Sequence, residues 1–198
     1  MDILEKLNNI GLLKESSAFI FDDKISKGDI ARYFSMVKNF DYSIKHKTVA
    51  SANSNEYLFV KYLDNENIQS TKLFKTILSI LKDLDYNVKL VKSYVHNYGI
   101  DSPTTIHIDN TTPSVIYYAN PKWDLEWGGE TFILEDNCDI RKAIYAKPGR
   151  IAVIDGNTLH IGNPTSLKAR ERRYIIVFKF VFIDANGNPQ HQLPFVDQ

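Results

Sequence analysis

The chain is poor in cysteine, since Cys138 is the single cysteine among 198 residues. One thiol cannot form a disulfide within the chain, and it cannot supply a cysteine-rich zinc site. Any metal ion that the protein binds must therefore be held by histidine and carboxylate side chains. The sequence contains five histidines, so the candidates for such a site are few.

The sequence also lacks net charge and long apolar runs. The 24 Lys and Arg residues balance the 24 Asp and Glu residues, so no long-range field attracts nucleic acid or an anionic membrane. No segment approaches the roughly 18 apolar residues that a spanning helix needs. The first residues alternate charged and apolar side chains, unlike a signal peptide. We expect a cytoplasmic, reduced protein that binds neither nucleic acid nor membranes.

What the chain does contain is typical of one globular domain. Hydrophobic residues make up 43% of the sequence and charged residues 24%, with 11 Tyr and 11 Phe available for a core. Apolar residues at spacings of three and four predict helices over residues 26–40 and 68–84. Strands are predicted over residues 18–21 and 56–62. We expect these helices to cover a sheet.

From residue 87 onward the pattern changes to short β segments separated by turns. Turn residues such as Gly128-Gly129 and Pro148-Gly149 lie between them. The predicted strands cover residues 88–95, 104–108, 114–118, 131–134, 141–145, 150–154 and 174–182. Many short strands at roughly 8–12-residue spacing are typical of a β-sandwich or a jelly roll.

Three side chains in this β region form a candidate metal site. His107 and Asp109 lie two positions apart at the end of a predicted strand, so both point to the same face. His160 follows at the end of another short segment. Two imidazoles and one carboxylate are the facial ligand set of Fe(II), which leaves positions open for a co-substrate and O₂, whereas zinc favours a closed tetrahedron. The alternative is an ordinary surface pair without a metal ion.

A cluster of basic residues follows the second histidine. Arg170, Arg172 and Arg173 lie 10 to 13 residues after His160. A dicarboxylate co-substrate that chelates the metal needs a cation at its far end, and Arg binds a carboxylate through two parallel hydrogen bonds. Adjacent strand residues point to opposite faces, so only one of Arg172 and Arg173 can point inward. The alternative for any one of them is a solvated loop charge.

These motifs resemble the Fe(II)- and 2-oxoglutarate-dependent dioxygenases, and most closely their prolyl 4-hydroxylase branch. The resemblance covers about residues 89–182 and rests on several motifs that follow one another in the family's order. They are the His-x-Asp of residues 107–109, Tyr-Ala-Asn at 118–120, Trp123, Gly-Gly-Glu-Thr at 128–131, the Pro-Gly-Arg strand at 148–155, His160 and Arg-Tyr at 173–174. Ala119 and Ile154 replace a Leu and a Phe of the family pattern and keep an apolar side chain.

The resemblance implies an α+β fold with a mainly β core. This core would be a double-stranded β-helix, of the jelly-roll and cupin-like type, with N-terminal helices packed on its major sheet. Residues 1–198 would form a single dioxygenase domain. Within it, residues 1–86 would be a helical and strand support region, residues 87–183 the β-helix core and residues 184–198 a C-terminal tail.

The resemblance also implies the ligands of the site. His107, Asp109 and His160 would be the catalytic metal ligands for Fe(II), with 2-oxoglutarate and O₂ as co-substrates and ascorbate as a further candidate. The family's spacing after the distal histidine favours Arg170 as the ligand of the far 2-oxoglutarate carboxylate. The local sequence, an Arg followed by Tyr and an apolar strand, favours Arg173, which we prefer.

Two tyrosines complete the candidate site. The resemblance implies that Tyr118 hydrogen-bonds the 2-oxoglutarate carboxylate, whereas its alternative is an ordinary core aromatic. Tyr98 matches a further co-substrate or substrate tyrosine less closely. We expect the nearby His96 to be a strand residue that faces solvent.

The implied activity is hydroxylation of a prolyl residue in a peptide or protein, with release of succinate and CO₂. Free proline or another small metabolite is the main alternative substrate. A rival of another class is a non-catalytic β-sandwich binding module in which the His and Asp residues are incidental. Fe(II)-dependent conversion of 2-oxoglutarate to succinate separates the enzyme from the module.

Overall fold

The computed structural model describes residues 18–47, 56–102, 104–109, 113–135, 139–156 and 158–190. Cys138, the residues before Ala18 and the end of the predicted C-terminal tail lie outside the described residues. In the described part, two antiparallel sheets and a few helices form a mainly β protein. The mainly β core expected from the sequence is therefore confirmed.

The larger sheet has seven strands in the order β1-β8-β5-β10-β4-β3-β2. All of its pairs are antiparallel, and the long strand β10 pairs with β4 on one side and β5 on the other. The strands are β1 (Ala18–Phe21), β2 (Ser43–Lys47), β3 (Glu56–Tyr62), β4 (Val88–Tyr98), β5 (Ser114–Tyr118), β8 (Ile151–Ile154) and β10 (Arg173–Phe182).

The smaller sheet has three strands and faces one side of the larger one. In it β6 (Thr131–Leu134) pairs with β7 (Ile140–Ile144) and with β9 (His160–Gly162). A short 3₁₀ turn, η1 (Leu125–Trp127), precedes β6. Apolar side chains from both sheets form one core cluster, which includes Ile116, Ile133, Ile175 and Val177. The candidate site residues lie along this side of the larger sheet.

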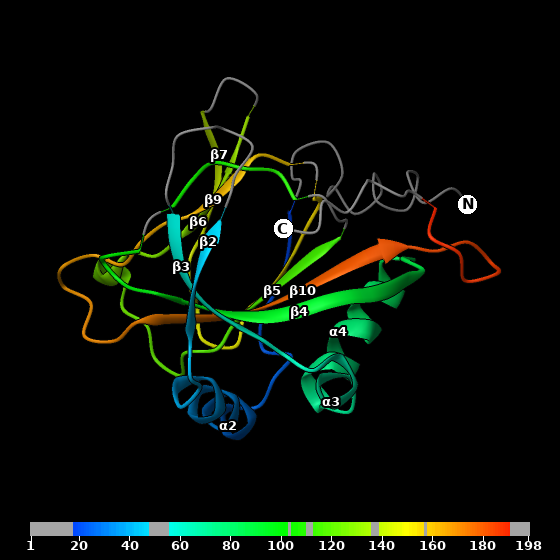
Figure 1. The fold of residues 1–198 in the computed structure, drawn as a ribbon, viewed down its shortest axis with the longest axis horizontal. Helices are drawn as coiled ribbons and strands as arrows, with labels where there is room; N and C mark the ends of the chain where they lie inside the picture. The colour runs from blue at the N-terminus through cyan, green and yellow to red at the C-terminus, as the bar shows by residue number, and fades with distance from the viewer. Residues whose placement is uncertain are drawn as a thin grey trace.

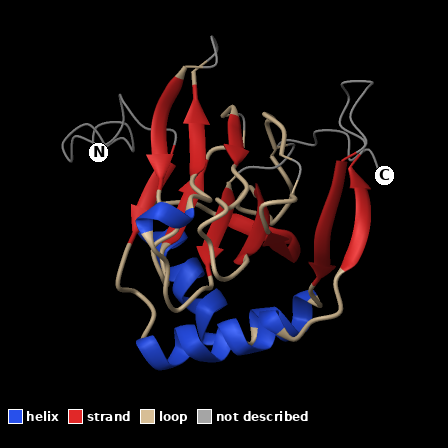
Figure 2. Ribbon diagram, turned by 90° about the vertical axis from the view of Figure 1, so that its left-hand side faces the viewer, coloured by secondary structure: helices blue, strands red, loops and turns tan. Residues whose placement is uncertain are grey.

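The helices cover the opposite side of the larger sheet. They are α2 (Lys27–Lys38), α3 (Asn65–Gln69) and α4 (Lys72–Asp83), and Figure 1 shows them below β4, β5 and β10, with β6, β7 and β9 above. Figure 2 shows the same separation of helices and strands from the side. A second core cluster joins the helices to the sheet through residues such as Leu73, Ile77, Ile176 and Phe178.

Strand β10 connects the two cores because alternate side chains point to opposite faces. Tyr174, Ile176 and Phe178 pack in the cluster under the helices, whereas Ile175 and Val177 pack in the cluster between the sheets. The period-two pattern predicted for this strand is confirmed. By the same alternation, Arg173 points toward the space between the sheets.

The structure corrects three predicted elements. The segment 104–108 is not a strand, because its only ladder contact with another described residue is an isolated bridge between His107 and His160. The helix predicted over residues 68–84 is two helices, since the Thr71 side chain accepts a hydrogen bond from the Phe74 N–H and caps the start of α4. The sequence pattern did not predict strand β2, and β4 extends to Tyr98, beyond the predicted end at residue 95. Among the described residues, no helix is long and apolar enough to span a membrane.

Candidate active site

The structure brings His107, Asp109 and His160 together. Their nitrogen and oxygen ligand atoms all lie within 4.8 Å of one another. Nε2 of His107 is 3.8 Å from Oδ1 of Asp109, and Nε2 of His160 is 3.7 Å from Oδ2. The Asp109 and His160 side chains are almost fully buried, and that of His107 is partly exposed. One divalent ion can therefore contact all three from a single point.

Backbone hydrogen bonds position these residues although His107 and Asp109 lie in no strand. The His107 N–H donates to the His160 carbonyl over 3.0 Å, and the His160 N–H donates back over 2.9 Å. The Asp109 N–H donates to the Gly156 carbonyl over 2.7 Å. His160 itself begins β9, which pairs with β6. The loop that carries the first histidine is thus tied to the sheet that carries the second.

Both imidazoles present the same nitrogen to the site. Nδ1 of His107 lies 3.0 Å from the Thr105 carbonyl oxygen, and Nδ1 of His160 lies 2.8 Å from that of Thr158. A carbonyl only accepts, so Nδ1 carries a proton in both rings, and in the neutral imidazole Nε2 then carries the lone pair. This backbone contact fixes the tautomer and the ring orientation that a metal ligand requires.

Asp109 is held ionised. Its burial raises the pKa, but the ammonium of Lys179, the imidazole of His160 and the hydroxyl of Ser114 outweigh burial, so the pKa is lowered. Ser114 Oγ donates to Oδ2 over 2.6 Å, and Lys179 Nζ donates to the same oxygen. A carboxylate that stays charged is the form that binds a metal ion.

Arg173 is fully buried between the sheets, with 0% of the residue exposed. Its Nη1 donates to the Gly129 carbonyl, and its Cζ lies 4.3 Å from the centroid of the Tyr98 ring. Its Nε and Nη2 have no hydrogen-bond partner among the described residues. Buried polar groups are almost always paired, so these two nitrogens indicate a place for an acceptor such as a carboxylate.

Two glycines shape the space around this guanidinium. A Cβ atom at Gly162 would lie 3.1 Å from Nη2 of Arg173 and 3.4 Å from the Tyr98 hydroxyl. A Cβ atom at Gly129, whose φ is +77°, would lie 3.2 Å from Cδ of Arg173. Gly162 and His160 are two residues apart in β9, a distance of about 7 Å along a strand. The same short strand thus contributes to the triad and to the surroundings of Arg173.

The two candidate tyrosines both lie beside Arg173. The Tyr118 hydroxyl donates to Oγ1 of Thr131 over 2.8 Å in a buried setting. Burial raises the pKa of Tyr118, although Arg173 opposes the shift, so the hydroxyl stays protonated. The Tyr98 hydroxyl lies 2.8 Å from Nδ1 of His96. His96 is partly buried and its ring packs between those of Tyr94 and Tyr98, so the expectation that it faces solvent is wrong.

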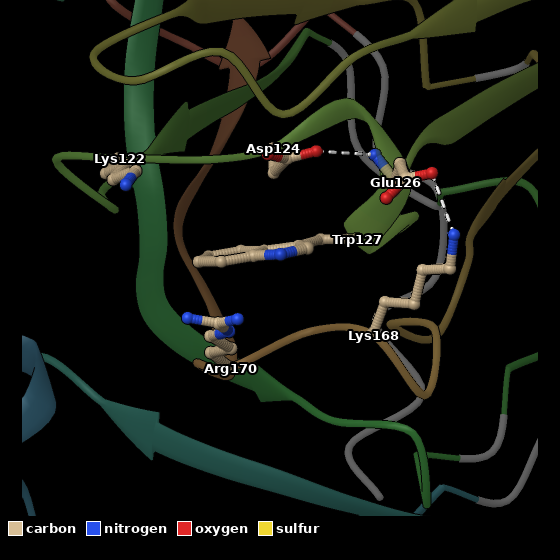
Figure 3. A pocket seen from close by; sticks show the side chains of 6 residues that line it. All are labelled: Lys122, Asp124, Glu126, Trp127, Lys168 and Arg170. Atoms are coloured by element: carbon tan, nitrogen blue, oxygen red, sulfur yellow. Dashed lines mark hydrogen bonds and ion pairs between the residues drawn. The ribbon is translucent and has the colours of Figure 1, made fainter.

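Arg170 lies in a different place. It is exposed and lines a surface cavity of about 530 Å³. The other lining residues are Lys122, Asp124, Glu126, Trp127 and Lys168. Figure 3 shows the Arg170 guanidinium beside the indole of Trp127, with Glu126 paired to Lys168. None of the triad residues lines this cavity, so Arg170 and Arg173 face separate sites.

The arrangement suits a divalent metal ion and an anionic co-substrate. Two imidazole nitrogens and one carboxylate make a mixed donor set that fits Fe(II) with several coordination positions left open. A buried guanidinium with two unpaired nitrogens, close to the strand that carries His160, suits the remote carboxylate of such a co-substrate. Both halves of the arrangement come from residues that the sequence analysis singled out.

Neither a protein-family model nor a curated protein sequence matches the chain, but solved structures do. One is a prolyl hydroxylase from Trichoplax adhaerens in complex with a hypoxia inducible factor oxygen degradation domain peptide fragment. It is 16% identical, covers 90% of this chain and 86% of its own, and has a TM-score of 0.62. A Pseudomonas putida prolyl-4-hydroxylase is 11% identical over 90% and 98% of the two chains, with a TM-score of 0.63.

A viral collagen prolyl hydroxylase from Paramecium Bursaria Chlorella virus-1, in its 2OG complex, is 14% identical. It covers 83% of this chain and 96% of its own, with a TM-score of 0.60. The chain has the prolyl hydroxylase fold. The resemblance to this branch of the 2-oxoglutarate and Fe(II) oxygenases is thereby confirmed for the fold, over nearly the full length of the solved chains.

Within this prolyl hydroxylase fold, sequence reasoning missed three residues that contact the candidate site. Lys179 pairs with Asp109, Thr131 receives the Tyr118 hydrogen bond, and Gly162 approaches Arg173 closely because it has no Cβ atom. The strand pattern contained a signal for Lys179, because a lysine stands on the inward face of an otherwise apolar strand. No signal of that kind marks Thr131, which sits in a strand as an ordinary β-branched residue.

Proposed function

We propose that the protein is an Fe(II)- and 2-oxoglutarate-dependent dioxygenase that hydroxylates a prolyl residue in a peptide or protein and releases succinate and CO₂. The observation that carries this proposal is that the short strand β9 contributes both to the triad and to the surroundings of Arg173. His160 at its start belongs to the triad, and Gly162 at its end lies close to Arg173, whose Nε and Nη2 have no partner among the described residues.

We further propose that residues 1–198 act as one dioxygenase domain in which the two sheets form a double-stranded β-helix. The support for this is the antiparallel pairing in both sheets, the shared core between them and the fold of the solved prolyl hydroxylases. In this proposal residues 1–86 support the major sheet, residues 87–183 form the β-helix core and residues 184–198 form the tail.

In the proposed site each residue has a defined task. His107 and His160 offer Nε2 lone pairs, since their Nδ1 protons are bound by carbonyls. Asp109 adds the single negative charge of the ligand set. When bound, Fe(II) supplies the activation of O₂ and the oxidation of a C–H bond, which no amino-acid side chain can provide. The protein contributes the placement of the reactants and the exclusion of water.

The co-substrate would be held by residues on the larger sheet. Arg173 would bind the remote carboxylate of 2-oxoglutarate through Nε and Nη2, its two unpaired groups. Tyr118, protonated and buried, can turn its hydroxyl from Thr131 toward that carboxylate. Tyr98 would support the guanidinium from the face of its ring. Arg170, which faces the surface cavity, remains the alternative only if Arg173 proves dispensable.

The prolyl substrate is supported by the matched structures, one of which holds a peptide from an oxygen degradation domain. Free proline or another small metabolite is the competing substrate, and a binding module without catalysis is the competing class. The decisive experiment is an assay of purified protein for Fe(II)-dependent conversion of 2-oxoglutarate to succinate. A proline-containing peptide array, read by mass for the gain of one oxygen atom, then tests the substrate. No conversion with any peptide or amino acid would refute the enzyme proposal.

A further inference from the structure

A second buried cation lies beside the triad. Lys179 is on β10, six residues after Arg173, and therefore shares the face of the strand that lies toward the smaller sheet. The residue is only 6% exposed. Its Nζ donates to Oδ2 of Asp109 and, over 3.0 Å, to Oγ of Ser114. Lysine is almost never buried to this extent unless it is paired, so the contact with Asp109 determines its place.

The contacts of Lys179 distinguish the two carboxylate oxygens of Asp109. The hydrogen bonds from Lys179 and from Ser114, the latter 2.6 Å long, both go to Oδ2. A carboxylate oxygen has two lone-pair sites, and two donors occupy them. Oδ1 lies 3.8 Å from Nε2 of His107, and Oδ2 lies 3.7 Å from Nε2 of His160. Both oxygens thus lie near a triad imidazole, but Oδ2 is the one that accepts the hydrogen bonds of Lys179 and Ser114.

We propose that Lys179 is a positioning residue for Asp109. Together with Ser114 it occupies Oδ2, so that Asp109 binds a metal ion through Oδ1 alone. This inference rests on the proposed function. A single-oxygen carboxylate and two imidazoles use three positions of an octahedral ion and leave three open, which is the number that a chelating 2-oxo acid and O₂ require. A carboxylate that bound through both oxygens would remove one of them.

Lys179 also sets the charge of the site. A divalent ion and Asp109 alone carry one net positive charge, and the ammonium of Lys179 raises this to two. A dianionic co-substrate entering a buried site is stabilised by a matching positive charge, because an unbalanced charge is costly away from water. Lys179 should therefore favour 2-oxoglutarate binding more than metal binding, since its ammonium repels the metal ion while it positions Asp109.

The effects of removing Lys179 on metal affinity and on 2-oxoglutarate affinity distinguish a positioning role from a merely structural ion pair. If the pair only stabilised the fold, its removal would weaken metal and co-substrate binding together and lower the melting temperature. If Lys179 positions Asp109, its removal leaves metal affinity unchanged or higher, lowers the affinity for 2-oxoglutarate and reduces the number of open positions on the ion. The two effects on the two ligands have opposite directions, so one set of titrations distinguishes them.

The experiment uses the full chain loaded with Mn(II), which permits binding measurements without turnover. Water-proton relaxation counts the exchangeable waters on the ion, and calorimetry gives the affinities for Mn(II) and 2-oxoglutarate. For Lys179→Met we expect an Mn(II) affinity at or above that of the wild type and one fewer exchangeable water on the ion. The affinity for 2-oxoglutarate should fall by about tenfold or more. Lys179→Arg, which keeps the charge and the donors, should restore the wild-type water count.

The matched control is Lys89→Met. Lys89 lies on the neighbouring strand β4, opposite Val181, and is exposed, so the same chemical change there should leave all three measurements unchanged. An unaltered water count and unaltered 2-oxoglutarate affinity in Lys179→Met would overturn the inference. If circular dichroism shows that Lys179→Met is unfolded, Lys179→Gln replaces it. A wild-type affinity for 2-oxoglutarate in that neutral variant would also overturn the inference. Failure of the wild type to bind Mn(II) would instead refute the proposed function itself.

Discussion

The guanidinium of Arg173 lies over the ring of Tyr98, with Cζ 4.3 Å from the ring centroid. This contact and the hydrogen bond to the Gly129 carbonyl hold the side chain in one orientation. Burial lowers the pKa of Arg173, while Tyr98 and Tyr118 oppose the shift, and a guanidinium remains protonated in proteins. A fixed, buried cation with two unpaired nitrogens can bind an anion without further ordering of its side chain.

The first prediction compares the two candidate arginines. Arg173→Ala should raise the 2-oxoglutarate concentration needed for half-maximal succinate formation by about 30-fold or more, because truncating one partner of a buried charge pair costs about 2–5 kcal/mol. Arg170→Ala is the matched control, since Arg170 is exposed and faces the surface cavity, and it should change this value little. The opposite ranking would assign the carboxylate to Arg170.

The second prediction concerns the triad. His107→Ala, Asp109→Ala and His160→Ala should each abolish Fe(II)-dependent turnover of 2-oxoglutarate in the absence of a prime substrate. Each removes one of three ligands, and loss of a ligand should weaken metal binding by more than about 100-fold, the upper range for supporting residues. Calorimetry with Mn(II) and the succinate assay give the two measurements. Turnover at the wild-type rate in any of the three variants would remove that residue from the proposed ligand set.

The third prediction uses the glycine beside Arg173. Gly162→Ala places a Cβ atom 3.1 Å from Nη2, in the space proposed for the carboxylate. We expect about tenfold weaker 2-oxoglutarate binding, since small displacements of positioning groups are costly, and unchanged affinity for Mn(II). The control is Gly28→Ala in α2, where a Cβ atom meets nothing within 4 Å. Equal 2-oxoglutarate affinities in the two variants would contradict this placement.

The fourth prediction is a pH dependence of stability away from the site. Hydrogen bonds from Arg150, at 2.9 Å to each oxygen, lower the pKa of Asp22 from 3.8 to about 2. The ion pair therefore stabilises the folded state above pH 4, and this contribution disappears as the pH falls toward 2. Asp22→Asn should reduce the free energy of unfolding by about 1–2 kcal/mol at neutral pH.

Urea denaturation at pH 6 and near pH 2 checks this result. The difference between Asp22→Asn and the wild type should be large at pH 6 and small near pH 2, where the wild-type carboxylate is itself becoming protonated. Lys147 also contacts Asp22, at 3.1 Å, so Lys147→Met serves as a second variant with a smaller effect of the same sign. A difference that stays constant across this pH range would show that the charge of Asp22 contributes nothing.

Patterns within a single element could be predicted from the sequence. The alternation in β10 follows from the period of a strand, and so does the outward position of Arg172, whose side chain binds Asn97 over 2.5 Å and Asp101 over 3.0 Å. The two helix regions follow from apolar spacing. These features depend on residues that are neighbours in the sequence.

Features that depend on distant partners could not be predicted in this way. The segment 104–108 has the composition of a strand, but within the described part of the chain its ladder contact is the single bridge between His107 and His160. The approach of Lys179 to Asp109 joins positions 70 residues apart, which no local pattern encodes. The structure also places Arg170 at the surface cavity and Arg173 in the core. Which of the two arginines is buried depends on the path of the loop before β10, and the spacing after His160 does not determine that path.

Strand β9 has only three residues, and His160 and Gly162 stand at its two ends. In the proposed enzyme the strand therefore sets the distance between the two binding points of the co-substrate. His160 at one end would bind the metal ion, and Gly162 at the other end lies beside Arg173. Neighbouring β6 fixes the register of β9 through Phe132 and Ile133. The distance between the two ends therefore cannot change by a shift of β9 along β6. A diacid with one carbon more or fewer would then fail to reach both ends, so selectivity for chain length would be built into the backbone.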